Sequence, residues 1–476
     1  MGADILDQDA TAQLAALAAR QVSAVELLAS ARVRQVESHP RLNLVVAQDG
    51  AAAEAAARAV DAARSRGEAL GGLAGLPMTI KDTFDVAGLP ASAGLPAFLD
   101  RACEDALVVA KVRGAGAVIW GKTNVPVMAG DWQSYNEPYG VSGNPWDPAR
   151  TPGGSSGGAA GSLAMGITAL EIGSDIGGSL RVPANFCGVY SHKPSWGAIS
   201  QRGHVPPVPG TLAARDLNVV GPMARSARDL KLLFSIIAEA PGAARPTPSL
   251  NGLRVGLWLD EPHYPLDPQV RSVIEAYAKA LAAAGVVVEP IKSPVNARAL
   301  KSAYQTLLGS IIGSDFPPGQ QEQMQAMRPA AKQAIAAGEG PDSAMAMILA
   351  YTATHAEWLA ADEVRAGLRH EAEQALARFD VILAPVTPVA AFPHDHRAFA
   401  DRVLTLSTGG TIPYTSMLDW IGLATACHLP STCVPAGLTE TGLPVGVQLI
   451  GPPGGDQLTL AVAEAFEAVR GFTPPL

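Results

Sequence analysis

The sequence predicts an α/β fold in which helices cover both faces of a central, mixed and twisted β-sheet. Short apolar runs at 76–80, 116–121 and 167–173 have the length and character of buried strands. These runs alternate with glycine- and proline-rich loops and with helical stretches such as 104–113. Further along, 253–291 has the strand, helix, strand order of a β-α-β unit. This alternation favours a layered α/β architecture.

Four consecutive stretches differ in pattern, and we expect them to form one domain, 1–476. The motifs that carry chemistry are spread from 75 to 451, which favours one interleaved domain over separable ones. We expect N-terminal helices in 1–70, a core with the catalytic motifs in 72–240, a β-α-β unit and helical walls of a substrate site in 241–378, and strands with a final helix that return to the core in 379–476.

Local signals place two of the N-terminal helices. Ser23 and Glu26 have the spacing of a capping box, which predicts a helix start at this point. An alanine-rich stretch at 51–67 predicts another helix that ends at Gly67. We expect these helices to pack on the core and to carry no chemistry.

Composition and charge exclude several classes of protein. Hydrophobic residues make up 48% and charged residues 17% of the 476, which is typical of a globular enzyme. The net charge is −9 and basic residues form no stripe, so no nucleic acid is expected as a partner. No run approaches the roughly 18 apolar residues of a membrane span. The first residues contain no apolar signal segment, so we expect a cytoplasmic protein without a membrane partner.

The cysteines have no spacing that predicts a disulfide framework or a metal site. None stands in a C-x-x-C pair, and we expect buried, reduced thiols at Cys103, Cys187, Cys427 and Cys433. We expect no metal and no cofactor, and a monomer or homodimer.

Residues 116–123 match the letters of a phosphate-binding loop, but their context does not. Such a loop needs exposed, glycine-rich backbone between a strand and a helix. Here the variable positions are Ala, Val, Ile and Trp, which resemble a strand, and Pro126 interrupts any helix that follows. Nucleotide binding is therefore not expected.

A second motif, G-x-S-x-G within 153–158, resembles the nucleophile elbow of α/β-hydrolases. That elbow requires a buried strand before it, and 144–152 contains three prolines. It also requires a catalytic histidine further along the chain. His192 and His204 are the nearest histidines, and we expect structural roles for both.

The preferred chemistry is amide hydrolysis, which needs a nucleophile, a base and donors for an oxyanion. Ser179 follows two glycines, whose turn can present backbone N–H groups to a carbonyl oxygen. Lys81 follows an apolar run, where loss of water would lower its pKa and make it a base. Ser155, in a second glycine-rich loop, can relay the proton. The alternatives are plain glycine turns and a Lys81 paired with Asp82 or Asp85.

An ordered set of motifs resembles the amidase signature family. It comprises 75–82, 121–126, 144–158, 173–188, 192–195, 379–388 and 442–451. The resemblance implies the amidase-signature fold, with Ser179 as nucleophile, Ser155 as a bridging serine preceded by a cis peptide, and Lys81 as base. It implies an oxyanion hole made by the backbone amides of Ile176, Gly177, Gly178 and Ser179. It also implies that Asp175 and Arg181 form a structural ion pair that steadies this turn.

The resemblance implies an amidohydrolase that forms an acyl-enzyme on Ser179. Its substrates are expected to be small aliphatic or aryl amides, together with esters or carbamates that meet the same nucleophile, and water. Val127, His192 and His428 depart from the residues usual in the family. These departures argue against one alternative, a tRNA amidotransferase component that uses glutamine. The other alternative is a non-catalytic binding protein on the same fold.

The substrate pocket is expected next to the GKTNVP motif at 121–126. We expect Met128, Ala129 and Gly130 to bind substrate, with Trp132 in either the pocket or the core. Helices of 300–360 are expected to complete the walls.

Overall fold

A large mixed sheet lies at the centre of the computed structural model, which describes residues 4–475. Its eight strands have the order β10-β9-β11-β15-β14-β7-β8-β6. The strands are β6 (Leu170–Asp175), β7 (Tyr190–Lys193), β8 (Val219–Ala224), β9 (Arg254–Leu257), β10 (Val287–Pro290), β11 (Val381–Pro385), β14 (Ser431–Leu438) and β15 (Pro444–Ile450). β9 pairs in parallel with β10 and β11, and the other pairs are antiparallel. The predicted mixed sheet is confirmed.

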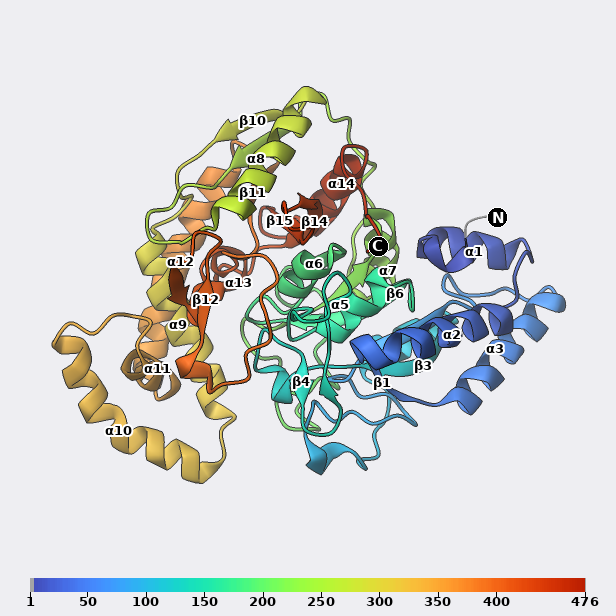
Figure 1. Ribbon diagram of the computed structural model, residues 1–476, viewed down its shortest axis with the longest axis horizontal. Helices are drawn as coiled ribbons and strands as arrows, with labels where there is room; N and C mark the ends of the chain where they lie inside the picture. Colours follow the sequence, from blue (N-terminus) through green and yellow to red (C-terminus); the bar gives the residue numbers. More distant parts are fainter. Residues whose placement is uncertain (1–3, 476) are drawn as a thin grey trace.

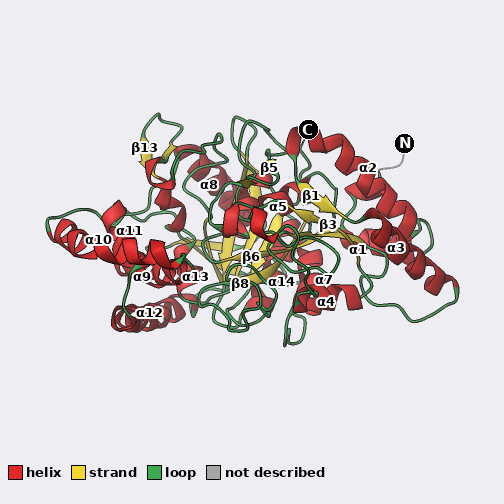
Figure 2. Ribbon diagram, turned by 90° about the horizontal axis from the view of Figure 1, so that it is seen from below, coloured by secondary structure: helices red, strands yellow, loops and turns green. Residues whose placement is uncertain are grey.

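Helices cover both faces of this sheet, because alternate side chains of its central strands enter two different cores. Val381 and Leu383 pack in one core and Ile382 and Ala384 in the other. One face is covered by α7 (Ala227–Ile237), α8 (Pro268–Ala283) and α14 (Asp456–Glu467), the other by α5 (Gly157–Ala164), α6 (Arg181–Cys187) and α13 (Gly422–Ala426). Figure 2 shows the strand layer between them. Burial on both faces explains why these strands are continuous apolar runs in the sequence.

A separate sheet of three strands lies beside the large one. It has the order β1-β3-β2, with β1 (Val45–Gln48), β2 (Pro77–Lys81) and β3 (Val118–Thr123). The apolar runs at 76–80 and 116–121, which have the character of buried strands, form β2 and β3 of this smaller sheet. In a fully buried apolar run of this length, no residue pattern indicates which strand the run pairs with. β2 nevertheless packs against β6 of the large sheet, and this contact brings the two sheets together.

The 116–123 stretch, whose letters match a phosphate loop, forms strand β3 over most of its length, as its apolar composition predicts. All six residues of β3 are buried.

Three helices precede or flank β1: α1 (Ala10–Ala18), α2 (Ala24–Leu42) and α3 (Gly50–Ser65). The predicted capping box at Ser23 and Glu26 is present, with both of its hydrogen bonds. Only helices were expected in 1–70, and β1 is a strand that this expectation missed. Its four residues are too few to show a period, and pairing with β3 decides their conformation.

A helical lobe extends from the sheet on the side opposite α1, α2 and α3 (Figures 1 and 2). It contains α9 (Ala297–Ser314), α10 (Pro318–Ala336), α11 (Ala344–Tyr351) and α12 (His355–Leu376). α9 packs against α11, α12 and α13, while α10 is mostly exposed and packs on α11. The remaining elements are α4 (Leu107–Gly114) and two short hairpins, β4 (Tyr135–Asn136) with β5 (Gly140–Val141) and β12 (Val403–Thr405) with β13 (Thr411–Pro413).

Within residues 4–475, none of the helices combines the length and apolar character that crossing a membrane requires.

Candidate active site

Lys81 is the last residue of β2, and its side chain is completely buried. Its Nζ lies 2.8 Å from Ser155 Oγ and 2.8 Å from Ser174 Oγ of β6. The alternative pairing with Asp82 or Asp85 does not form. Asp82 instead lies beside Lys122, and Asp85 forms an ion pair with Arg101.

Burial gives Lys81 the electrostatics of a base. Removal from water lowers the pKa of Lys81 to about 7, although the carboxyl groups of Asp175 and Glu171 favour the ammonium form. Glu171 opposes this decrease only weakly, because burial raises the pKa of its own carboxyl to about 8. A large share of Lys81 is therefore a neutral amine at neutral pH.

Ser155 lies in the loop before α5, and its side chain is buried. The Gly154–Ser155 peptide is cis, as the resemblance implied. Gly154 is needed here because a Cβ at this position would lie 2.4 Å from the carbonyl oxygen of Asp131. The next residue, Ser156, donates its N–H to the carbonyl of Ser179 at 3.3 Å. This bond joins the two serine loops.

Ser179 follows β6 after the turn 176–178 and reaches a cavity with 6% of its surface exposed. Among residues 4–475, no hydrogen bond joins the Ser179 hydroxyl to that of Ser155. Lys81 is therefore hydrogen-bonded directly to Ser155, whereas the loops of Ser155 and Ser179 are connected by the backbone hydrogen bond from Ser156 to Ser179.

The turn between β6 and Ser179 is organised by Asp175. Its carboxylate accepts hydrogen bonds from the amides of Gly178, at 2.9 Å, and Leu180, at 3.2 Å. Four amides were expected to form the oxyanion hole, and that of Gly178 is not free to do so because it bonds Asp175. Within the described residues, the amides of Ile176, Gly177 and Ser179 have no hydrogen-bond partner.

Arg181 anchors this turn to two other elements. It donates two hydrogen bonds of 3.0 Å to Asp175, and both side chains are fully buried. Burial alone would raise the pKa of Asp175, but Arg181 outweighs it and the pKa is lowered. Arg181 also donates to Thr425 of α13 and to Gln448 of β15. The expected ion pair is thus in contact, and it ties the turn to the sheet.

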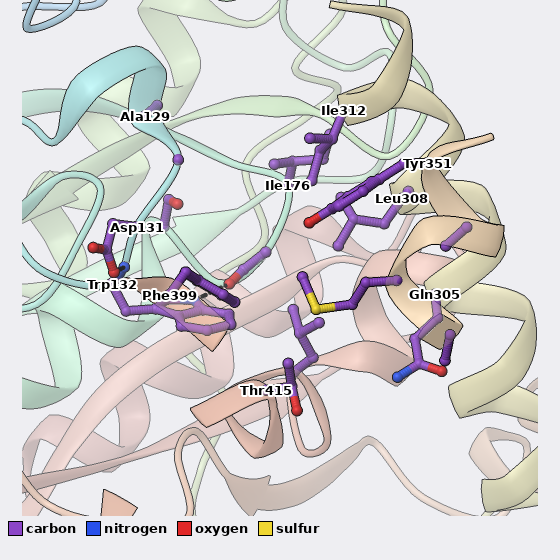
Figure 3. Close-up of a pocket in the computed structure, with 18 of the residues that line it drawn as sticks. Ala129, Asp131, Trp132, Ile176, Gln305, Leu308, Ile312, Tyr351, Phe399 and Thr415 are labelled. Atoms are coloured by element: carbon purple, nitrogen blue, oxygen red, sulfur yellow. Dashed lines mark hydrogen bonds between the residues drawn. The ribbon is translucent and has the colours of Figure 1, made fainter. Parts of the chain in front are cut away.

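Ser179 lines an apolar cavity of about 140 Å³. Figure 3 shows other residues of its walls, among them Ile176 and Tyr351. Its walls come from the 129–132 loop, the 176–179 turn, the lobe helices α9 and α11, and the 399–418 segment. The apolar and aromatic side chains that line it include Trp132, Ile176, Leu308, Ile312, Met347, Tyr351, Phe399 and Leu418.

Two of the three residues expected to bind substrate lie at the cavity. Ala129 and Gly130 line the cavity, but Met128 does not. The chain turns at Met128, where φ is 50° and the N–H donates to the carbonyl of Ala93 at 2.7 Å. Trp132 lines the cavity although it is 7% exposed, and its Nε1 donates to the carbonyl of Gly177. It thus belongs to the cavity and the core together.

Sequence reasoning missed the 399–418 wall and the surroundings of Ser174. Phe399 packs against Trp132 in the cavity wall, with ring centroids 5.8 Å apart. His204, expected to be structural, lies 2.8 Å from Ser174 Oγ and so stands directly behind Lys81. His192 bonds Thr432 and Asp456, away from this site. A buried histidine next to a strand hydroxyl leaves no signal in the spacing of either residue.

The comparisons with known proteins agree with this fold. The sequence profile of the amidase family matches residues 26–460. The A component of the glutamyl-tRNA(Gln) amidotransferase from Chloroflexus aurantiacus is 32% identical over 96% of this chain and 95% of its own length. A crystal structure of an amidase superposes with a TM-score of 0.80 at 30% identity, covering 97% of this chain and 99% of that one. A bacterial aryl acylamidase of the amidase signature family superposes with a TM-score of 0.79 at 25% identity, covering 97% and 96%. The chain therefore belongs to the amidase signature family, whose enzymes hydrolyse amide C–N bonds.

Proposed function

We propose that this protein is an amidohydrolase that cleaves amide bonds of small, uncharged aliphatic or aryl substrates through an acyl-enzyme on Ser179. Esters and carbamates of the same shape would meet the same nucleophile. The observation that carries the proposal is the 2.8 Å contact between the buried Lys81 amine and Ser155, beneath a cavity into which Ser179 opens.

The reaction proceeds in two steps. The neutral amine of Lys81 takes the proton of Ser155 while Ser155 takes that of Ser179, and Ser179 Oγ attacks the substrate carbonyl carbon. The same relay returns the proton to the leaving nitrogen as the C–N bond breaks. Water then attacks the ester of Ser179 by the same route and releases the acid.

The turn after β6 supplies the oxyanion hole. The amides of Ile176, Gly177 and Ser179 are the donors, because that of Gly178 is held by Asp175. Loss of one such donor typically costs about 3–4 kcal/mol of barrier. Asp175 and Arg181 touch no substrate in this mechanism, and their role is to hold the turn.

The lining of the cavity favours uncharged substrates. Its charged member, Asp131, is already satisfied by an ion pair with Arg402 and by hydrogen bonds of 2.7 Å from Tyr414 and from the amide of Trp132. The ammonium and carboxylate of an amino acid would therefore meet apolar walls, and their loss of water would be uncompensated. Aliphatic and aryl groups gain from the same walls.

A second candidate is the glutaminase component of an amidotransferase, and it is favoured by the similarity to the Chloroflexus protein. Such a component would use glutamine and would depend on a partner chain. The purified chain alone, assayed on an aryl anilide and on glutamine, separates the two. Turnover of the anilide without a partner supports the amidohydrolase, whereas turnover of neither substrate without a partner would support the amidotransferase component.

The decisive test is capture of the acyl group. Incubation with an activated aryl ester should add one acyl mass to the peptide that contains Ser179, as read by mass spectrometry. Ser179→Ala should lose both the adduct and the anilidase activity, while Ser235→Ala, which alters an exposed serine of α7, should keep both. An unlabelled wild-type protein, or a label that persists in Ser179→Ala, would reject the proposed nucleophile.

A further inference from the structure

A buried hydrogen-bond chain leads away from Lys81 on the side opposite Ser155. Lys81 Nζ is 2.8 Å from Ser174 Oγ, and Ser174 Oγ is 2.8 Å from His204 Nε2. On the other edge of the ring, His204 Nδ1 is 2.7 Å from the carbonyl oxygen of Pro206. All three side chains are buried, and only Lys81 has a part in the mechanism above.

The chemistry of the end groups decides the direction of every bond in this chain. A carbonyl oxygen can only accept, so His204 Nδ1 carries the proton and donates it to Pro206. A neutral imidazole has a single N–H, so Nε2 must accept a hydrogen bond from Ser174. The single proton of the Ser174 hydroxyl is then engaged in the hydrogen bond to His204. Toward Lys81 the hydroxyl can therefore only accept a hydrogen bond.

His204 is held in the neutral state that this argument requires. Burial, together with the nearby Lys81, lowers the pKa of His204 to about 3, against the opposing effect of the hydrogen bond to Pro206. The ring of Phe84 packs edge-on at 4.9 Å, with no charge of its own. The carboxyl groups on the facing strand β6, Glu171 and Asp175, act on Lys81 and are not bonded to His204.

The consequence for Lys81 is geometric. A neutral amine has two N–H groups and one lone pair, and it lies within hydrogen-bond distance of two hydroxyls. If Ser174 could donate, it would compete with Ser155 for the lone pair. Because Ser174 can only accept, one N–H points to Ser174 and the lone pair remains for the proton of Ser155.

We propose that His204 is a positioning residue that makes Ser174 an obligate acceptor and so directs the lone pair of Lys81 to Ser155. The inference rests on the proposed function, because it assigns His204 to the same proton relay. The proton taken from Ser155 arrives on the lone pair, and the Ser174–His204 chain gains and loses none.

The first test is the kinetics of His204→Leu on an aryl anilide. Without the acceptor, Ser174 can donate to the Lys81 lone pair, so kcat should fall about 10- to 100-fold, a part of the roughly 10²–10⁴-fold that a general base contributes. KM should stay within about twofold, since His204 touches no substrate in this mechanism. The acid limb of the pH profile should move to lower pH, because the neutral amine gains a hydrogen bond. His370→Gln, at an exposed site of α12, should change none of these.

Two further variants distinguish positioning from mere packing. His204→Gln can place its amide oxygen toward Ser174 and its NH₂ toward Pro206, so it should restore most of the lost kcat. In a Ser174→Ala background, His204→Leu should cause no additional loss beyond about twofold, because its effect passes through Ser174. The proposal would be overturned if the losses of kcat caused by Ser174→Ala and His204→Leu multiplied in the double variant. It would also be overturned if the kcat of His204→Gln were as low as that of His204→Leu.

A measurement that does not use activity keeps the two proposals separate. Nitrogen-15 NMR of histidine-labelled protein, with the His204 signals assigned by their loss in His204→Gln, should show a protonated Nδ1 and an unprotonated Nε2 at pH 7. The opposite tautomer would reject the role of His204, even if Ser179 is the nucleophile. If the tautomer is as expected but wild-type protein forms no acyl-enzyme, the proposed function fails and the positioning role fails with it. Retained acyl-enzyme formation with unchanged His204→Leu kinetics rejects the positioning role alone.

Discussion

Lys81 and Lys122 are buried lysines on neighbouring strands, but their surroundings suit them to different tasks. β2 and β3 pair in parallel with Ile80 opposite Lys122, and neither lysine side chain is exposed to solvent. Burial lowers the pKa of both. Burial alone therefore does not distinguish a base from a structural cation.

The partners make the difference. Lys122 Nζ donates to the carbonyl oxygens of Phe84 and Pro90, both at 2.7 Å, and lies 3.5 Å from Asp82. The two carbonyl oxygens can only accept, so neither of them can give a proton to Lys122. The hydrogen bonds of Lys81 go to two hydroxyls, and that of Ser155 can also donate. A buried lysine is suited to proton transfer when its neighbours include a group that can give a proton back.

The largest effect is expected for Lys81→Met. Loss of the base should lower kcat/KM on an aryl anilide by about 10³-fold or more. Circular dichroism should show an unchanged fold, because methionine fills a similar volume. An activity within about tenfold of wild type would contradict the assignment of Lys81 as base.

The same variant should be more stable than the wild type. The pKa of about 7 in the folded state lies below the ordinary value of 10.5, so the unfolded chain holds the proton more firmly. The cost of burying Lys81 is therefore fully present below pH 7 and disappears as pH rises toward 10.5. Lys81→Met should raise the free energy of unfolding by about 1–3 kcal/mol at pH 7, and by less at pH 9.5. Urea denaturation at the two pH values measures this.

Lys122→Met should have the opposite signature. It leaves Asp82 and two buried carbonyl oxygens without their cation, so the free energy of unfolding should fall by about 3 kcal/mol. At a temperature where the variant is folded, its pH profile should match that of the wild type. If the decrease of kcat/KM at low pH occurred at a different pH in folded Lys122→Met, the two lysines would titrate together.

The pH dependence of the wild type sharpens the comparison further. In the proposed mechanism the active form of Lys81 is the neutral amine, so kcat/KM on a neutral amide should rise with pH and level off above about 7. Below that point it should fall about tenfold per pH unit. Asp175 and Glu171 face Lys81 and limit the depression of its pKa, so their loss would move the limb to lower pH. A limb near pH 4 would instead indicate a carboxylate base.

The smallest effect is expected for Ser92→Ala, which alters the Lys122 side only. Ser92 Oγ donates to the Asp82 carboxylate, and its N–H lies 3.4 Å from the same group. Loss of the hydroxyl should lower the free energy of unfolding by about 1 kcal/mol and leave the pH profile unchanged. Thermal unfolding and the anilide assay check the two parts. A changed pH profile would link Ser92 to the site.

The residues of the proposed proton relay could be singled out in the sequence because the chemistry proposed for them is local. A cis Gly154–Ser155 peptide, a glycine turn before Ser179 and a lysine at a strand end each require a particular run of neighbouring residues. Such runs remain visible as motifs, and their order along the chain points to the family. The layered α/β fold was likewise predictable, because burial on both faces produces continuous apolar runs.

The tertiary structure alone decided which strands pair, which amide is free and which side chains stand behind the base. β2 and β3 form their own sheet, Asp175 takes the amide of Gly178, and Phe399 closes the cavity from far along the chain. His204 meets Ser174 across 30 residues of sequence. Contacts of this kind depend on how elements pack in space, and packing partners distant in sequence impose no period or spacing on the residues that make them.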